Sequence, residues 1–83
     1  MFTDEAWDDY LHWQECDRKV VQKINTLLEE CRRDPFSGSG KPQPLAGSLS
    51  GFWSRRITLA DRLVYLPKAG KIFVIACRFH YDP

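Results

Sequence analysis

Apolar side chains recur at helical spacing in the first 33 residues of the chain. In the segment 17–33 they lie three or four residues apart on one stripe, at Val20, Val21, Ile24, Leu27, Leu28 and Cys31. This period of about 3.6 residues predicts an amphipathic helix that begins after Asp17 and ends before Pro35. A shorter helix is predicted over residues 4–15, with Thr3 as its N-cap. Two consecutive helices with a short connection should pack as a hairpin.

From residue 52 onward the pattern changes to the alternation that is typical of β-strands. Strands are predicted at residues 52–58, 62–66 and 71–81, with turn residues between them. The connections are too short for a crossover, so the strands must pair antiparallel. Helices followed by strands predict an α+β fold, in which a two-helix hairpin packs on one face of a small twisted sheet.

The last predicted strand has two different faces. Phe73, Ile75, Cys77 and Phe79 share one face, and Ile72, Val74, Ala76, Arg78 and His80 share the other. The first face is uniformly apolar, so we expect it to line the core. The second becomes polar toward its end, where Arg78 and His80 would point the same way.

Glycine and proline are concentrated between the helices and the strands. Residues 36–51 hold four of the five glycines and two of the five prolines. Lys41 and Gln43 each precede a proline, which disfavours helical backbone, so both are expected to be extended. A loop that is stiff where it carries polar groups is a frequent place for a functional site, although it could equally be a plain helix-to-sheet connection.

Length and composition describe a small folded domain. The 83 residues suffice for one domain over 1–83, and 43% hydrophobic with 13% aromatic side chains is too apolar for a disordered chain. We expect a cytoplasmic protein that is not bound to a membrane, because no apolar run approaches about 20 residues and no signal peptide is visible. The three cysteines form no Cys-x-x-Cys pair, and Cys31 and Cys77 are expected to be buried thiols.

The small net charge of +1 hides an uneven distribution. Residues 1–40 carry five basic and nine acidic side chains, whereas residues 41–83 carry seven basic and two acidic ones. The balances are therefore −4 and +5. The seven basic residues are Lys41, Arg55, Arg56, Arg62, Lys68, Lys71 and Arg78. A polyanion would bind this second half, although a merely solvated face would look the same.

Few catalytic chemistries fit these residues. The chain lacks a phosphate-binding P-loop, a His-Glu-x-x-His motif and a Gly-x-Ser-x-Gly elbow. RNA cleavage remains, because RNA carries its own nucleophile and needs only a base, an acid and cations around the phosphate. Three arginines (Arg56, Arg62 and Arg78) could supply charge, His80 could be the acid, and Tyr81 could stack on a base. A lone histidine near a chain end is more often structural, so the residues alone leave both readings open.

Several segments together carry a family resemblance. They are residues 5–14 (EAWDDYLHWQ), 23–25, 35–36, 38–45, 49–58, 62–65 and 76–81 (ACRFHY). With this spacing the chain resembles the YoeB-type toxins of the RelE superfamily. The resemblance implies a RelE-like, microbial RNase-like fold and a metal-independent endoribonuclease without cofactors. It further implies cleavage of messenger RNA in the A site of the 70S ribosome, a YefM-like antitoxin as partner, and the capacity to form a homodimer.

The resemblance also implies roles for individual residues. His80 matches the general acid, Tyr81 the substrate-orienting tyrosine, Arg56 and Arg62 the phosphate-binding arginines, and Lys41 a basic residue near the site. The candidate catalytic residues are therefore His80, Arg62, Gln43 and Tyr81, and the candidate RNA-binding residues are Lys41, Arg56 and Arg78.

Gln43 is a departure, because the family typically has glutamate there. A neutral amide can orient the 2′-hydroxyl but cannot take its proton. One alternative is therefore a protein that occupies the A site and blocks translation with little cleavage. A small dimerisation domain with no RNA role is another.

Overall fold

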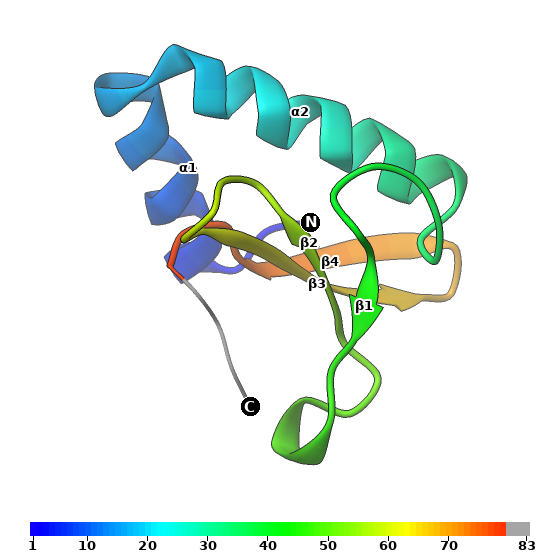
Figure 1. Ribbon diagram of the computed structural model, residues 1–83. Helices are drawn as coiled ribbons and strands as arrows, with labels where there is room; N and C mark the ends of the chain where they lie inside the picture. Colours follow the sequence, from blue (N-terminus) through cyan, green and yellow to red (C-terminus); the bar gives the residue numbers. More distant parts are fainter. Residues whose placement is uncertain (80–83) are drawn as a thin grey trace.

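The computed structural model of the protein describes residues 1–79. Within this part, two helices precede a four-stranded antiparallel sheet with strand order β1-β2-β3-β4 (Figure 1), so the predicted α+β fold is confirmed. The elements are α1 (Asp4–Cys16), α2 (Arg18–Arg33), β1 (Gln43–Pro44), the 3-10 helix η1 (Gly47–Leu49), β2 (Trp53–Arg56), β3 (Arg62–Lys68) and β4 (Lys71–Ala76).

The helices begin where their capping residues predict. The Thr3 hydroxyl accepts a hydrogen bond from the Ala6 amide at 3.2 Å, and the Asp17 carboxylate accepts from the amides at the start of α2. Asp17 alone connects the two helices. About two helical turns from Asp17 on each helix, the Tyr10 hydroxyl donates to the Asn25 side chain at 2.8 Å, so the helices pack side by side as a hairpin. Neither helix of the described part is long and apolar enough to cross a membrane.

The sheet has two short edges that the sequence pattern does not reveal. Residues Gln43 and Pro44, predicted only as a stiff loop, pair with Ser54 and Trp53 of β2. Proline has no backbone N–H to donate to a neighbouring strand, so it is tolerated at the edge of a sheet. At the opposite edge, Phe2 forms a parallel bridge with Val74. Figure 1 shows α2 lying across one face of the sheet.

The prediction that the Phe73 face of the last strand lines the core is wrong. Val74 is 1% exposed and packs in the core with the helices, whereas Phe79 is 62% exposed. The reason is a β-bulge. Tyr65 pairs with Val74 and Val64 pairs with Ala76, so Ile75 is an extra residue in β4. The bulge breaks the two-residue alternation, and as a result Val74 and Cys77 both face the helices.

Helix α1 holds the end of β4 through three contacts with Cys77. The Cys77 amide donates to the Asp9 carboxylate at 3.1 Å, and the Trp13 indole donates to the Cys77 carbonyl at 2.8 Å. The Cys77 thiol donates to the Ala6 carbonyl at 3.5 Å. Burial raises the pKa of Asp9, while the hydrogen bond from Cys77 partly offsets that rise. These contacts fix where the chain leaves the sheet on its way to residue 80.

The three cysteines are expected to differ sharply in reactivity. Cys31 and Cys77 are buried, as predicted, and Cys16 is exposed. Burial raises the pKa of the Cys77 thiol to about 12 and also raises that of Cys31. Since the thiolate is the reactive form, iodoacetamide should modify only Cys16 in the folded protein and all three cysteines in denaturant. Intact-mass spectrometry checks this, with Cys16→Ser as the control that should take no label when folded. Rapid labelling of Cys77 in the native protein would contradict the packing described above.

Candidate active face of the sheet

Two arginines lie on the face of the sheet that the helices leave open. Leu63 and Tyr65 of β3 pack in the core with the helices, so Arg62 and Val64, which alternate with them, point to the opposite face. Arg56 at the end of β2 pairs directly with Arg62 and therefore shares its face. The structure thus brings together two of the predicted phosphate-binding residues.

Gln43 joins the same face from the edge strand. It pairs with Ser54, which lies two residues before Arg56 on β2 and so points the same way. From ordinary strand spacing, the Cα atoms of Gln43 and Arg56 are roughly 8 Å apart. The Gln43 side chain is exposed. A single substrate phosphodiester group could therefore contact the amide and both guanidinium groups.

Lys41 lies beside this group, but not in the conformation that the sequence predicts. Its φ is 51°, in the left-handed region, whereas Gln43 is extended as expected. The preceding Gly40 also has a positive φ, of 82°, and its carbonyl accepts a hydrogen bond from the Arg56 amide at 2.6 Å. The proline rule disfavours right-handed helical backbone at Lys41. Lys41 avoids that region by adopting left-handed backbone together with Gly40. The hydrogen bond from the Arg56 amide to the Gly40 carbonyl holds this turn against β2.

The turn between β2 and β3 fixes the guanidinium of Arg62. Its Nη1 donates to the carbonyl oxygens of Thr58 at 3.0 Å, Leu59 at 3.2 Å and Asp61 at 3.1 Å. All three bonds use Nη1. The edge formed by Nε and Nη2 is therefore the part of the guanidinium that can form two parallel hydrogen bonds with a phosphate.

Arg78 has different surroundings from those expected for it. It is half-buried in a hollow whose lining includes Glu5 and Asp9 of α1, and its guanidinium lies 4.5 Å from the centre of the Phe79 ring. Its positive charge acts against the rise in the pKa of Asp9. The two carboxylates make this hollow a poorer place for a phosphate than the face that carries Arg56 and Arg62.

The predicted residues His80 and Tyr81 lie outside the described residues. Phe79, the last described residue, is hydrogen-bonded beside Arg62: its carbonyl accepts from the Arg62 amide at 2.9 Å. His80 follows Phe79 in the sequence, so the chain enters the segment with His80 from a point next to Arg62.

Arg55 is one of the seven basic residues expected to attract a polyanion, but it is completely buried, at 0% exposure, and cannot contribute to a basic surface. Its guanidinium donates to the Tyr65 hydroxyl at 3.0 Å and to three carbonyl oxygens of the loop after α2, those of Asp34, Ser37 and Ser39. Arg55 therefore anchors the loop that leads to Lys41 and Gln43. The alternation of β2 could have identified it, because Arg55 shares its face with the partly buried Trp53 and not with Arg56.

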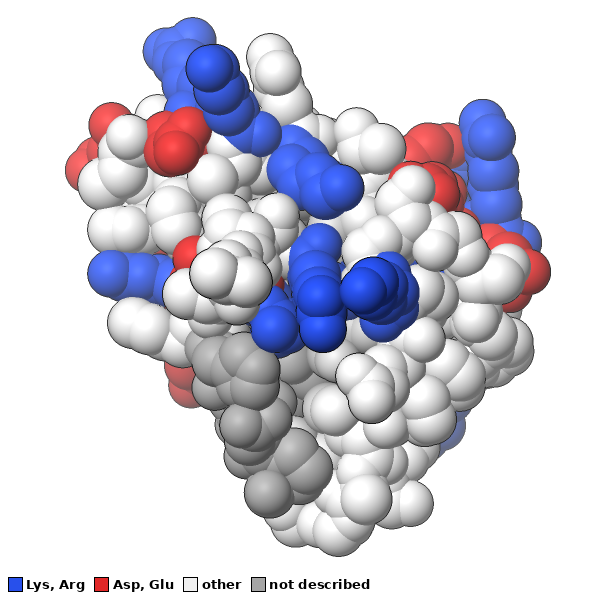
Figure 2. All heavy atoms as spheres, in the orientation of Figure 1, with Lys and Arg blue, Asp and Glu red and all other residues white. Residues whose placement is uncertain are grey.

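The distribution of basic side chains on the surface is consistent with a candidate site that contains Lys41, Arg56 and Arg62. Figure 2 shows Lys and Arg side chains gathered over the middle of the face in view, where the ends of β2 and β3 and the loop before β1 lie. Such a surface attracts polyanions. Within residues 1–79, no group of three or more His, Cys, Asp or Glu side chains is placed to hold a metal ion.

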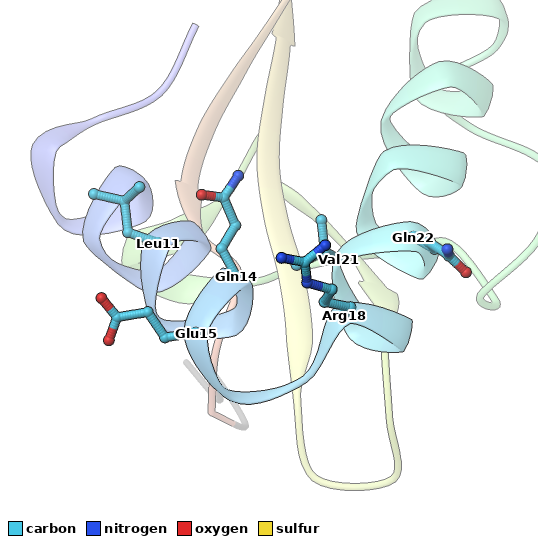
Figure 3. A pocket seen from close by; sticks show the side chains of 6 residues that line it. All are labelled: Leu11, Gln14, Glu15, Arg18, Val21 and Gln22. Atoms are coloured by element: carbon cyan, nitrogen blue, oxygen red, sulfur yellow. The ribbon is translucent and has the colours of Figure 1, made fainter.

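A separate hollow of about 650 Å³ lies at the corner between α1 and α2 (Figure 3). Its lining mixes charged, polar and apolar side chains from both helices: Leu11, Gln14, Glu15, Arg18, Val21 and Gln22. None of the candidate site residues is among them. The hollow is therefore separate from the candidate site on the sheet.

Comparison with known proteins identifies close relatives. Residues 2–81 match the family model described as YoeB-like toxin of bacterial type II toxin-antitoxin system. The chain is 54% identical over 81 residues to the toxin YoeB of Escherichia coli K12, covering 98% of this chain and 96% of that protein. The structure of a YoeB/ParE toxin from Agrobacterium tumefaciens superposes with a TM-score of 0.93 at 49% identity, covering 98% and 96% of the two chains.

Structures of YoeB from Staphylococcus aureus are similar as well. One is a YoeB–YefM complex, at 39% identity, and another is a YoeB dimer, at 40% identity. Both have a TM-score of 0.91, and in each the match covers 98% of this chain and 94% of the other.

Proposed function

Because this chain belongs to the YoeB-like toxins of bacterial type II toxin-antitoxin systems, we propose that it is a ribosome-dependent endoribonuclease that stops translation by cleaving messenger RNA in the A site. The observation that carries this proposal is the shared open face of Gln43, Arg56 and Arg62, with Lys41 beside it. This face combines an orienting amide with cations, which is what cleavage by the RNA's own 2′-hydroxyl requires.

The chemistry is a displacement at phosphorus. The 2′-oxygen attacks the adjacent phosphate and its proton passes to a water molecule, since Gln43 cannot accept it, while the bond from phosphorus to the 5′-oxygen breaks. Arg56 and Arg62 stabilise the negative charge that develops on the phosphate oxygens. The Gln43 carbonyl oxygen accepts a hydrogen bond from the 2′-hydroxyl and so directs it at phosphorus. His80 protonates the departing 5′-oxygen and Tyr81 orients the substrate, which leaves a cyclic phosphate and a free 5′-hydroxyl.

Cleavage is expected only in the presence of ribosomes. Among the candidate site residues that the structure describes, Gln43 is an amide and the others, Lys41, Arg56, Arg62 and Arg78, are cations, so none of them can act as a base and naked RNA should react slowly. A ribosome would hold the message bent and in line, which supplies orientation that the protein does not. Mapping RNA ends after incubation with programmed ribosomes, and with the same message alone, tests this. New 5′-hydroxyl ends should appear inside the A-site codon in the first sample and not in the second.

The second candidate function is A-site occupation with little cleavage, and Gln43 favours it. If ribosomes bind the protein and translation stops without new RNA ends, this function replaces the first. We also infer a YefM-like antitoxin and a homodimer for this chain, supported by the S. aureus YoeB–YefM complex and YoeB dimer.

Gln43→Glu is expected to raise the single-turnover cleavage rate about tenfold, which corresponds to about 1.4 kcal/mol of barrier. β1 is extended and the two side chains have the same shape, so a carboxylate would occupy the place of the amide and could take the 2′-proton. Lys41, Arg56 and Arg62 would keep that carboxylate ionised and lower its pKa, which limits the gain. Gln43→Ala is the matched control and should be slower than wild type. A Gln43→Glu protein slower than wild type would show that Gln43 acts only by orientation.

A further inference from the structure

The turn at residues 58–61 holds the end of the described chain as well as Arg62. The Asp61 carboxylate accepts a hydrogen bond from the Phe79 amide at 2.7 Å, and the Phe79 carbonyl accepts one from the Arg62 amide at 2.9 Å. The backbone N–H and C=O of Phe79 are thus hydrogen-bonded to two consecutive residues, Asp61 and Arg62. The two contacts span 17 and 18 residues of sequence, so they join distant segments and not a local turn.

Phe79 needs such a restraint. Its φ is 66°, in the left-handed region, where a residue with a side chain is strained. The side chain cannot hold this conformation through burial, because it is 62% exposed. The hydrogen bond from an amide to an ionised carboxylate is among the stronger ones in proteins. Asp61 is therefore the group that is best placed to keep the Phe79 backbone in its strained conformation.

The carboxylate is itself oriented by the turn. Its second oxygen accepts a hydrogen bond from the Thr58 hydroxyl at 2.8 Å, and that hydroxyl accepts from the amides of Ala60 and Asp61. The same turn provides the three carbonyl oxygens that bind Nη1 of Arg62. One short segment thus sets the direction of a phosphate-binding arginine and the backbone of the residue that precedes His80.

We propose that Asp61 is a positioning residue for RNA cleavage, acting through the Phe79 backbone on Arg62, to which that backbone is hydrogen-bonded. This inference rests on the proposed function. Asp61 does not contact the RNA. By holding the Phe79 backbone, whose carbonyl is bonded to the Arg62 amide, it keeps Arg62 in line with the phosphate, where a misplacement of about 1 Å can cost about 100-fold in rate.

The test separates positioning from plain support of the turn. Asp61→Ala removes the bond to Phe79, whereas Asp61→Asn keeps a side-chain oxygen that can accept it. Thr58→Val removes the hydroxyl and its three hydrogen bonds within the turn, but leaves Asp61 and Phe79 in place. Single-turnover rates and half-saturating ribosome concentrations would be measured for all four proteins on programmed ribosomes. Hydrogen exchange at the Phe79 amide reports the contact directly.

Asp61→Ala should lower the maximal rate about 10- to 100-fold, with half-saturation changed by less than about threefold, and should expose the Phe79 amide to exchange. Asp61→Asn should recover most of the rate. Thr58→Val removes one of the groups that orient the carboxylate and should therefore lose some rate, but clearly less than Asp61→Ala. The inference is overturned if Asp61→Ala cleaves like wild type, or if Thr58→Val loses as much rate as Asp61→Ala. Wild-type protein that binds ribosomes without cutting would instead overturn the proposed function, and this inference with it.

Discussion

His80→Ala is expected to lower the single-turnover rate of messenger RNA cleavage about 100- to 10,000-fold, the usual cost of losing a general acid. Histidine is the residue type that titrates near neutral pH, His80 is the histidine among the candidate site residues, and the leaving 5′-oxygen needs a proton. Ribosome binding should change little, because the cations of the open face remain. The measurement is a rate on programmed ribosomes at saturating protein.

His12→Ala is the matched control and should cleave at the wild-type rate. His12 lies on α1, where its ring packs 5.0 Å from that of Trp13 and its Nδ1 lies 3.7 Å from the Cys16 thiol. These neighbours belong to the helix and not to the sheet face that carries Arg56 and Arg62. A folded His80→Ala protein as fast as wild type would remove His80 from the mechanism.

Arg55→Met should destabilise the protein by about 3 kcal/mol, because one change removes four hydrogen bonds of a buried charged donor. For a domain of this size, that predicts a fall in melting temperature of at least about 10 °C. Thermal unfolding followed by circular dichroism measures it. Arg55→Lys should restore little, because an ammonium group lacks the planar fork that reaches the separate carbonyl oxygens and the Tyr65 hydroxyl.

The neighbouring Arg56 offers a control with the opposite behaviour. Its side chain is exposed on the open face, so Arg56→Met should change stability by less than about 0.5 kcal/mol. The same change removes a proposed phosphate contact and should therefore slow cleavage strongly. If Arg55→Met melted like wild type, or if both changes affected stability equally, Arg55 would not be the anchor of the loop after α2.

The sequence predicts the helices well because their signals are local. Thr3 and Asp17 cap helices within three residues of themselves, and the stripe from Val20 to Cys31 depends only on helical periodicity. The register of the first hairpin was not predicted: a turn at 59–61 would pair Arg56 with Val64, whereas β2 ends at Arg56 and pairs it with Arg62.

The errors arise where distant segments decide the structure. The bulge at Ile75 depends on how β4 pairs with β3 and is held by α1, and no single-strand pattern records it. Pro44 belongs to a strand only because Ser54 and Trp53 lie alongside. Arg55 is a charged residue that most patterns place outside, and its burial requires loop carbonyls 16 to 21 residues away.

The left-handed backbone at Lys41 lowers the stability of the fold at a residue whose charge the proposed function would use. Glycine would adopt its φ of 51° with about 1–2 kcal/mol less strain, so folding alone would favour glycine here. Lysine adds a positive charge here, which the proposed function would use. An engineer who optimised this loop for thermal stability would be led to Lys41→Gly, and the more stable protein would have lost a cation from the face proposed to bind RNA. Under the proposed function, selection for tighter folding and selection for toxicity act in opposite directions on this one residue.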